Sequence, residues 1–248
     1  MRRFFVTQAL PVDATLTLPS DVADHAIKVL RMQVGDALEL ADGQGAVVRA
    51  TIVDVTPLTV HIDESVPGQV ELPLSVHLFC GLPKGDKAEW IVQKATELGA
   101  STVTFFPSTW ATAKWPAAKV DRKLARLVAI AQGAAEQSHR AVVPAVGYVA
   151  GLASVAAATE EAKLVAYEES AKLGERAVLA TTLAAHPKSL AVVFGPEGGL
   201  TPAEVATLGE AGFLAAGLGP RILRTETAPL YLLSAVSALT ELQGASDE

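Results

Sequence analysis

Two neighbouring segments near the end of the chain decide the fold: SLAVVFGPEGGLTPAE at residues 189–204 and FLAAGLGPRILRTETA at residues 213–228. Each begins with a short apolar run that predicts a buried strand, and each continues through a glycine-rich turn toward a helix. We expect these helices to begin at Thr201-Pro202 and near Thr225. Thr225 or Thr227 could cap the second helix, and Thr225 is the more economical choice. Ligands of open α/β sheets bind at the carboxyl ends of strands, and glycine allows the backbone to approach a ligand closely. The two turns therefore predict a binding site.

Upstream of these segments, from Leu72 onward, apolar strands alternate with helical segments. Strands are expected at residues 74–82, 102–106, near 142, 164–167, 190–194 and 213–218, and the longer helices at 84–98 and 120–138. Gly99 is well placed to end the first of these helices, because glycine readily adopts the left-handed conformation found there. Alternating strands and helices indicate an α/β fold whose parallel sheet is joined by crossover connections.

The N-terminal region has a different pattern. Short strand-like runs at residues 3–6, 16–18, 37–40, 46–55 and 59–62 surround a single helix expected at 21–30. Asp42-Gly43-Gln44-Gly45 is a hairpin signal between two of these strands. We therefore predict a small β-barrel domain at residues 1–70 and an α/β domain at 71–248, with the linker near Pro67-Gly68.

Composition indicates an ordinary globular protein. Of the 248 residues, 50% are hydrophobic and 19% are charged, and the net charge of −7 argues against a generic nucleic-acid coat. The single cysteine, Cys80, excludes an internal disulfide and fits a reducing cytosol. The uncharged stretch 141–159 is mostly alanine and valine, so it predicts a buried strand and a short helix and no membrane span. With no secretory leader, the expected location is the cytoplasm.

Several common catalytic and nucleotide-binding patterns are missing from the sequence. Neither the P-loop run G-x-x-x-x-G-K-[ST] nor the dinucleotide fingerprint G-x-G-x-x-G occurs. The five histidines have no metal-ligand spacing, so we expect no metal, and no Ser-His-Asp or Cys-His set stands at a nucleophile elbow. The glycines at 195–199 and 217–219 either make tight turns only or present backbone amides to an adenosine or carboxylate group.

Arg221 and Arg224 lie between the second glycine turn and the start of the following helix. The helix dipole disfavours cations at a helix N-terminus, so their placement favours a function such as holding an anionic ligand. The structural alternative is a salt bridge from these arginines to Glu226 or Glu197.

A basic stripe is predicted on the helix at 120–138. Its members fall at i, i+3, i+4 and i+7, and they are Lys119, Arg122, Lys123 and Arg126, with Lys114 upstream beside Trp110 and Trp115. Such a face suits RNA phosphates and stacked bases, or it is simply solvated. A second basic group, in the N-terminal domain, consists of Arg2, Arg3, His25, Lys28 and Arg31.

The glycine segments also carry a family resemblance. Residues 194–200 (FGPEGGL) and 218–228 (LGPRILRTETA) closely resemble the RsmE family of bacterial 16S rRNA (uracil-N3)-methyltransferases, in the SPOUT superfamily. Further segments that look like this family follow in order along nearly the whole chain, at residues 3–6, 25–32, 84–87, 93–99 and 135–144. One departure is His139, which stands where the family usually has a small residue such as glycine.

This resemblance implies a fold and a function. It implies an N-terminal PUA-like RNA-binding β-barrel, a C-terminal trefoil-knotted domain, and a homodimer with RNA spanning both subunits. The implied reaction is the S-adenosylmethionine-dependent methylation of N3 of a specific uridine in 16S rRNA of the small ribosomal subunit. The apolar helix around 230–239 is either a dimer interface or part of the core. By resemblance, the cofactor-binding residues are Phe194, Gly195, Pro196, Glu197, Gly198, Leu218, Gly219, Arg221, Ile222, Leu223, Thr225, Thr227 and Ala228.

The implied chemistry sets requirements for catalytic residues. Uracil N3 must be aligned with the methyl carbon and must lose its proton, and the negative charge developing on O2 or O4 must be stabilised. Arg224 or Arg140 can supply the positive charge, and Glu136 or Glu226 can take the proton. Two other functions stay open from the sequence: methylation of a ribose 2′-hydroxyl by a knotted enzyme, and a non-catalytic RNA-binding assembly factor that keeps the fold.

Overall fold

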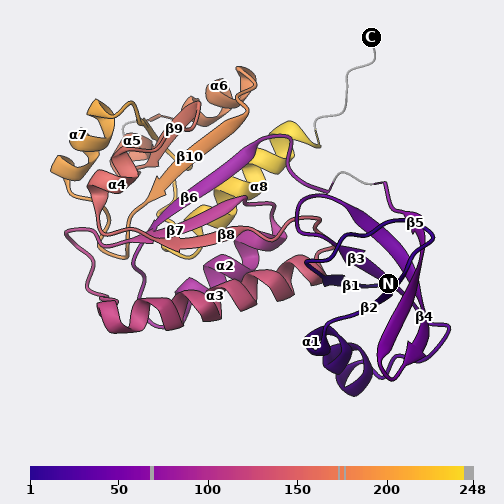
Figure 1. The fold of residues 1–248 in the computed structure, drawn as a ribbon. Coiled ribbons are helices and arrows are strands. Elements are labelled where there is room, and N and C mark those ends of the chain that lie inside the picture. Colours follow the sequence, from indigo (N-terminus) through magenta and orange to yellow (C-terminus); the bar gives the residue numbers. More distant parts are fainter. Residues whose placement is uncertain (68–69, 173, 176, 243–248) are drawn as a thin grey trace, which may run out of the picture. The chain divides into compact units, whose positions relative to one another are not determined.

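The structure, a computed structural model, describes residues 1–67, 70–172, 174–175 and 177–242 and divides into two compact units (Figure 1). Unit 1 consists of Met1–Glu71 with Gln132–Val143, and unit 2 of Leu72–Ala131 with Pro144–Glu248. The sequence pattern assigns 132–143 to the second domain. Its contacts in unit 1 join residues 69 to 136 positions apart in the chain, which no local pattern reveals. The linker expected at Pro67-Gly68 lies partly outside the described residues.

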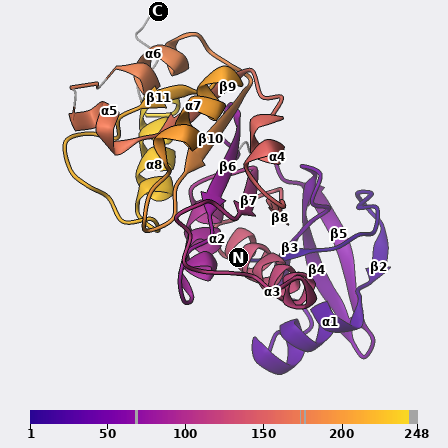
Figure 2. The ribbon, with the colours of Figure 1, turned by 90° about the vertical axis from the view of Figure 1, so that its left-hand side faces the viewer.

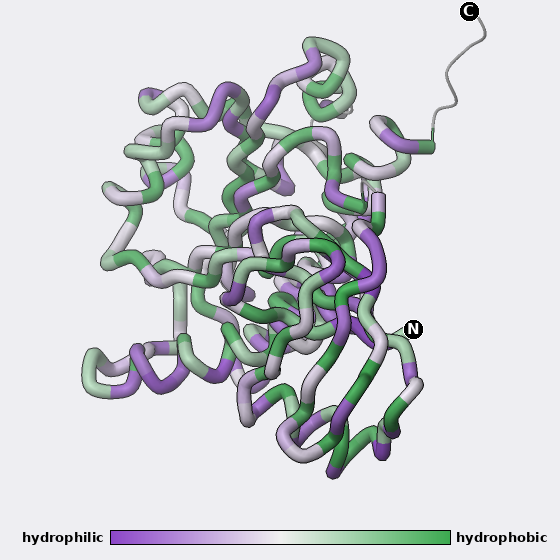
Figure 3. The backbone as a smooth tube through the Cα atoms, turned by 45° about the vertical axis from the view of Figure 1, so that its right-hand side comes forward, coloured by the Kyte–Doolittle hydropathy of each residue, from purple (hydrophilic) through white to green (hydrophobic). Residues whose placement is uncertain are grey.

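Unit 1 is built on a five-stranded sheet in the order β1-β3-β4-β5-β2. Its strands are β1 (Arg2–Phe5), β2 (Thr15–Thr17), β3 (Ala37–Ala41), β4 (Val47–Val55) and β5 (Leu58–Ser65). β1 is parallel to β3, and the other neighbours are antiparallel, with the predicted turn at 42–45 joining β3 to β4. Hydrophobic and hydrophilic residues alternate along β5 (Figure 3), so one set of side chains, including Val60 and Ile62, enters the core.

A short helical segment follows β2. The helix expected at 21–30 consists of α1 (Ser20–Ala23) and a π-helical continuation, η1 (Asp24–Val29). Ala26 is fully buried in the core of unit 1. Lys28 is exposed and forms an ion pair with Asp24 at 2.8 Å, so this face of the segment carries a solvated charge pair.

Glu71 holds the segment 132–143 against the rest of unit 1. Its carboxylate accepts hydrogen bonds from the Arg140 guanidinium and from the backbone N–H groups of Ala141 (3.1 Å) and Val142 (3.3 Å). The Arg140 side chain is only 3% exposed. Because Glu71 engages the backbone of residues 141 and 142, the strand expected near Val142 begins later, as β8 (Ala145–Tyr148).

A second buried ion pair joins the same segment to the sheet. Arg3 is 8% exposed and donates to Glu39 from Nε (3.1 Å) and Nη2 (2.9 Å), and also to the His139 carbonyl. The His139 ring lies 3.0 Å from the same carboxylate. Burial alone would raise the pKa of Glu39, but the hydrogen bonds and charges of Arg3 and His139 outweigh it and lower that pKa. His139 has a φ of 57°, a conformation that favours glycine, which accounts for the small residue usual here in the family that the sequence resembles.

Unit 2 contains a six-stranded sheet in the order β11-β9-β10-β6-β7-β8. Its strands are β6 (Ser75–Gly81), β7 (Thr102–Phe106), β8, β9 (Ala162–Ala166), β10 (Ser189–Phe194) and β11 (Leu214–Ala216). Its helices are α2 (Lys87–Glu97), α3 (Ala117–Gln137, which ends in unit 1), α4 (Leu152–Ala156), α5 (Glu168–Lys172), α6 (Val178–Ala184), α7 (Pro202–Glu210) and α8 (Ala228–Thr240). Every neighbouring pair of these strands is parallel, which confirms the predicted parallel α/β sheet.

Helices cover both faces of this sheet (Figures 1 and 2). α4 and α7 pack on one face against a core that includes Phe79, Phe106 and Val193. α2 and α8 lie on the other face and contact each other. Leu232 and Val236 of α8 are fully buried, so this apolar helix contributes to the core of its own chain.

Local sequence signals account for the start of α7. Thr201 Oγ1 accepts a hydrogen bond from the Glu204 N–H (3.1 Å), and the Glu204 carboxylate accepts one from the Thr201 N–H (2.8 Å), a reciprocal capping box. The start of α8 differs from the prediction. It begins at Ala228, and Thr225 does not cap it because its hydroxyl donates to the Gly195 carbonyl at 3.0 Å.

His77 gives unit 2 a predictable dependence of stability on pH. Its ring nitrogens lie 2.7 Å from Glu160 Oε1 and 2.8 Å from Thr104 Oγ1, and its side chain is 18% exposed. Burial lowers the pKa of His77 below its ordinary 6.5, although the Glu160 carboxylate acts in the opposite direction. The unfolded chain therefore binds a proton more readily than the folded protein, and stability falls as the pH drops through about 6.5.

We expect the unfolding temperature of unit 2 to decrease between about pH 7.5 and 5.5, and His77→Gln to make this decrease smaller. Thermal unfolding measured across this range by a probe in the unit 2 sheet tests the prediction. His61→Gln on β5 of unit 1 is the control and should leave the slope for unit 2 unchanged. Equal slopes in the wild type and His77→Gln would show that another group controls the acid sensitivity.

Candidate functional site

A pocket lies at the carboxyl ends of β9, β10 and β11, where the glycine turns predict a binding site. Its volume is about 620 Å³, within the range typical of small-molecule sites. It is lined by Lys87, Trp110, Ala166, Tyr167, Glu168, Glu169, Phe194, Gly195, Pro196, Glu197, Gly198, Gly199, Leu200, Pro202, Leu218, Gly219, Pro220, Arg221, Ile222, Leu223, Arg224, Thr225 and Ala228. Every residue assigned to the cofactor by resemblance, except Thr227, is among them.

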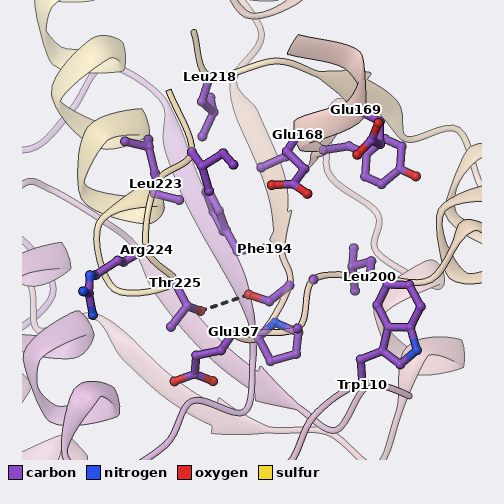
Figure 4. Close-up of a pocket in the computed structure, with 18 of the residues that line it drawn as sticks. Trp110, Glu168, Glu169, Phe194, Glu197, Leu200, Leu218, Leu223, Arg224 and Thr225 are labelled. Atoms are coloured by element: carbon purple, nitrogen blue, oxygen red, sulfur yellow. Dashed lines mark hydrogen bonds between the residues drawn. The ribbon is translucent and has the colours of Figure 1, made fainter. Parts of the chain in front are cut away.

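Two glycines of the first loop, Gly195 and Gly198, have no room for a side chain. A Cβ atom on Gly195 would lie 2.8 Å from the carbonyl carbon of Gly199, and one on Gly198 would lie 3.0 Å from the Trp110 carbonyl oxygen. The hydrogen bond from Thr225 to the Gly195 carbonyl ties the second loop to the first (Figure 4). The two loops therefore present backbone to a ligand at close range.

Apolar side chains form other surfaces of the pocket. Figure 4 shows Phe194, Leu200, Leu218 and Leu223 around the cavity, with Trp110 at one side of it. Trp110 is 49% exposed, so much of its indole ring faces solvent. Apolar walls with a few polar groups are typical of sites for small ligands that contain flat rings.

Lys87, the first residue of α2, joins two carboxylates at the edge of the pocket. Its Nζ atom lies 3.0 Å from Glu197 Oε1 and 3.0 Å from Glu226 Oε2. Hydrogen bonds to these two carboxylates raise the pKa of Lys87, so its ammonium group stays charged. Burial alone would raise the pKa of Glu197, but the Lys84 backbone N–H, at 3.1 Å, and the Lys87 side chain lower it, so Glu197 is ionised.

Arg221 and Arg224 have no carboxylate partner in the described part of the chain. The two carboxylates considered for them, Glu197 and Glu226, are instead paired with Lys87. Both arginines are exposed, and in Figure 4 Arg224 points away from Phe194. The structural alternative to anion binding is therefore wrong for these arginines.

Comparisons with known proteins identify the family. Residues 70–237 match the RNA methyltransferase domain family, and residues 18–65 match the RNA methyltransferase PUA domain family. The chain is 41% identical to ribosomal RNA small subunit methyltransferase E of Bacillus subtilis (strain 168) over 251 residues, which cover 98% of each chain. The chain belongs to the ribosomal RNA small subunit methyltransferase E family.

Two more members of the methyltransferase E family show how far the similarity extends. The protein from Mycobacterium tuberculosis (strain CDC 1551 / Oshkosh) is 35% identical over 253 residues, covering 98% of this chain and 94% of that one. The crystal structure of the Neisseria gonorrhoeae member bound to S-adenosyl methionine has a TM-score of 0.84 at 31% identity, covering 96% of this chain and 98% of that one. These findings confirm the family resemblance and the N-terminal PUA domain, and the trefoil knot stays a prediction.

The candidate catalytic residues of this methyltransferase E chain are divided between the units. In unit 2, Arg224 lines the pocket, and Glu226 lies beside it as the partner of Lys87. In unit 1, Glu136 is half-buried and accepts a hydrogen bond from Gln132 at 3.1 Å. The prediction that Arg140 supplies positive charge for catalysis is wrong. Its guanidinium is buried and already bound to a carboxylate, so its role is structural.

Several pocket residues were missed from the sequence. Lys87 and Trp110 lie beyond the ends of β6 and β7, and residues 166–169 begin at the last residue of β9. The glycine-rich turns mark only two of the strand ends, but in a parallel sheet ligands bind at the carboxyl end of any strand. The same rule applied to all the predicted strands finds these residues.

The basic stripe on α3 is only partly available to a ligand. Arg126 forms a two-bond ion pair with Glu89 of α2, with Nε–Oε1 at 2.7 Å and Nη2–Oε2 at 2.8 Å. Lys123 lies over the Trp115 ring, 5.4 Å from its centroid. The cations of this region that remain exposed without such a contact are Lys114, Lys119 and Arg122.

The basic residues predicted in unit 1 also separate into two groups. Arg2, His25, Lys28 and Arg31 are exposed, so they are accessible to a ligand. The prediction that Arg3 binds RNA is wrong, because its guanidinium is buried and bound to a carboxylate of the same sheet. An alternating strand places one of two adjacent arginines inside, and the sequence alone does not say which.

The residues that the structure describes show little basis for other kinds of site. None of their His, Cys, Asp and Glu side chains come together in a group of three or more that could hold a metal ion. None of their helices has both the length and the apolar character needed to cross a membrane. Cys80 is buried, and burial raises the pKa of its thiol to about 12, which makes it a poor nucleophile.

Proposed function

We propose that this protein is an S-adenosylmethionine-dependent methyltransferase that modifies N3 of a specific uridine in 16S rRNA. The observation that carries the proposal is that two glycine loops separated in sequence line one pocket of about 620 Å³ at the carboxyl ends of a parallel sheet. Membership of the methyltransferase E family supports it, as does a relative whose structure contains S-adenosyl methionine. The two alternative functions, ribose methylation and non-catalytic RNA binding, have no comparable support.

The residues of the pocket fit this cofactor. The loop at Gly195 and Gly198 leaves a surface of backbone against which a ligand can pack, and Leu218 and Leu223 offer apolar surfaces to an adenine ring. Arg221 is exposed at the rim, where it can hold a carboxylate. When bound, S-adenosylmethionine supplies a methyl carbon made electrophilic by its positively charged sulfur. The residues that would hold it are Phe194, Gly195, Pro196, Glu197, Gly198, Leu218, Gly219, Arg221, Ile222, Leu223, Thr225 and Ala228.

The chain itself must orient the uracil and make N3 reactive. N3 carries a proton and is a poor nucleophile until that proton leaves, and the resulting negative charge spreads onto O2 and O4. Among the four residues considered from sequence, Arg224 and Glu226 belong to the unit that holds the pocket. Arg224 offers a guanidinium at the rim, suited to the substrate base or a neighbouring phosphate.

Arg224→Ala is expected to lower the rate of methyl transfer by about 10- to 100-fold, the equivalent of one hydrogen bond to a charged group. The fold should be unaffected, because Arg224 is exposed and pairs with no described carboxylate. Single-turnover methyl transfer and a thermal melt measure the two effects. An unchanged rate would remove Arg224 from the mechanism.

The RNA is proposed to contact both units. We propose residues 1–70 as an RNA-binding domain and 71–248 as the methyltransferase domain, acting as a homodimer in the cytoplasm on the small ribosomal subunit. The exposed basic residues support this reading, and they are Arg2, His25, Lys28, Arg31, Lys114, Lys119 and Arg122. Lys28 remains in the proposed set because its single contact to Asp24 joins two largely exposed side chains, and Lys123 remains because a cation over an indole ring can still meet a phosphate. Arg3 and Arg126 are left out because each makes two hydrogen bonds to a carboxylate.

Methyl transfer from labelled S-adenosylmethionine to small ribosomal subunits that lack the modification tests the proposal. The expected product, after nuclease digestion and nucleoside analysis, is labelled 3-methyluridine. Label that blocks alkaline cleavage would indicate ribose methylation instead. Absence of both label and cofactor binding would favour the RNA-binding assembly factor.

A further inference from the structure

Lys87 occupies an unfavourable position for a cation. It is the first residue of α2, where the helix dipole repels positive charge. Its side chain is 26% exposed and is held by Glu197 and Glu226, each 3.0 Å from Nζ. A cation kept against the helix dipole by two carboxylates is a candidate for a functional role.

Lys87 can be reached from two cavities. One is the proposed cofactor pocket, which it lines. The other lies between α2, α3 and the segment before α8, and it is lined by Asp86, Lys87, Glu89, Trp90, Gln93, Ile130 and Glu226. Trp90 is 50% exposed there, with Lys94 Nζ over its ring at 5.4 Å from the centroid, and the exposed part of the ring offers an aromatic surface on which a base can stack. A base in this second cavity and a cofactor in the pocket would therefore meet at Lys87.

The hydrogen bonds of Lys87 leave one donor for a substrate. An ammonium group has three N–H donors. Glu197 Oε1 accepts one of them, and Glu226 Oε2 lies 3.0 Å from Nζ as an ion-pair partner. No other described residue contacts Nζ in this way, so at least one donor has no acceptor among the described residues. A carbonyl oxygen of a uracil base is an acceptor of the kind that the third donor needs.

We propose that Lys87 is a catalytic residue that donates a hydrogen bond to a uracil oxygen adjacent to N3 and stabilises the negative charge formed when N3 loses its proton. This inference rests on the proposed function. The N3–H bond breaks with its electron pair left on the base, and the proton passes to solvent water. The N3 pair then forms the bond to the methyl carbon, and the pair of the broken carbon–sulfur bond goes to sulfur. Lys87 keeps its proton, and Glu197 and Glu226 act as positioning residues.

Three variants separate the charge of Lys87 from its packing. Lys87→Met removes the charge at similar length, and Lys87→Arg keeps the charge with a different geometry. Lys84→Met is the matched control, because the contact of Lys84 to Glu197 is made by its backbone N–H and its side chain is exposed. Thermal melts and calorimetric titration with S-adenosylmethionine check that each variant folds and binds the cofactor.

Methylation of small subunits is then measured from about pH 6 to 10. Lys87→Met should lose about 100- to 1,000-fold in rate near pH 7, the loss typical of removing a group that stabilises an oxyanion. Its rate should rise about tenfold per pH unit, since hydroxide must now remove the N3 proton without help. The wild type and Lys84→Met should show a flatter profile, and Lys87→Arg should lie between. Subunits reconstituted with 5-fluorouridine rRNA, whose N3–H is more acidic, should rescue Lys87→Met selectively.

The possible results point in different directions. A rate within about threefold of the wild type, or a loss that is equal at every pH and on both substrates, overturns the proposal. A loss of cofactor affinity in Lys87→Met that accounts for the whole rate effect would make Lys87 a cofactor-binding residue and also overturn it. The proposed function is judged separately, on whether the wild type forms 3-methyluridine at all.

Discussion

Gly195→Ala should weaken the binding of S-adenosylmethionine by about 100-fold. The new Cβ would lie 2.8 Å and 2.9 Å from the carbonyl carbon and Cα of Gly199 and 3.0 Å from the Leu200 nitrogen. All three atoms belong to the backbone, so the loop must move instead of a side chain, and overpacking of this kind costs about 1–3 kcal/mol. The movement also displaces the carbonyl that accepts the hydrogen bond from Thr225. Tenfold in affinity corresponds to about 1.4 kcal/mol, which sets the expected size.

The control for this substitution is Gly209→Ala in α7. A Cβ atom at Gly209 meets no heavy atom within 4 Å, and alanine is a better helix former than glycine. Cofactor affinity should therefore be unchanged, and stability equal or higher. Isothermal titration calorimetry measures both variants. If Gly195→Ala binds the cofactor as tightly as Gly209→Ala does, the glycine loop is not part of the binding surface.

Glu71→Gln should destabilise unit 1 by about 3 kcal/mol. The Arg140 side chain is 3% exposed, and Glu71 accepts hydrogen bonds from its guanidinium and from two backbone N–H groups. Removing one charge of a buried pair leaves the other desolvated without compensation, which typically costs about 3–5 kcal/mol. We place the effect at the low end because the Glu71 side chain is 31% exposed.

Hydrogen exchange detected by mass spectrometry measures this effect by unit. Peptides from β1, β3 and the 132–143 segment should exchange faster in Glu71→Gln, whereas peptides from β10 should not. The matched control is Glu64→Gln, which breaks an ion pair with Arg49 whose side chains are 56% and 43% exposed. An exposed pair contributes about 0–1 kcal/mol, so the control should have little effect. Similar exchange in the two variants would show that the segment is held to unit 1 by other contacts.

The sequence by itself determined those features that depend on neighbouring residues. Apolar runs and glycine turns predicted β10, β11 and the loops after them, and these loops do line the pocket. The reciprocal hydrogen bonds between Thr201 and Glu204 start α7 where the pattern indicated. Such signals act within one turn of a helix or along one strand, so they are visible in the order of residues.

Only the tertiary structure decided how charged residues are paired. Lys87 meets Glu197 across 110 residues, and Arg140 meets Glu71 across 69. Lys87 therefore pairs with the carboxylates that were the possible partners of Arg221 and Arg224 in the sequence. The pairing of Arg140 with Glu71 gives Arg140 a structural role and excludes it from catalysis. From the sequence alone, each carboxylate has many possible cationic partners. The fold decides which pair forms, because it brings distant strand ends and segments together. For this protein the strands and loops of the site follow from local patterns, whereas its charges are placed by contacts that no local pattern contains.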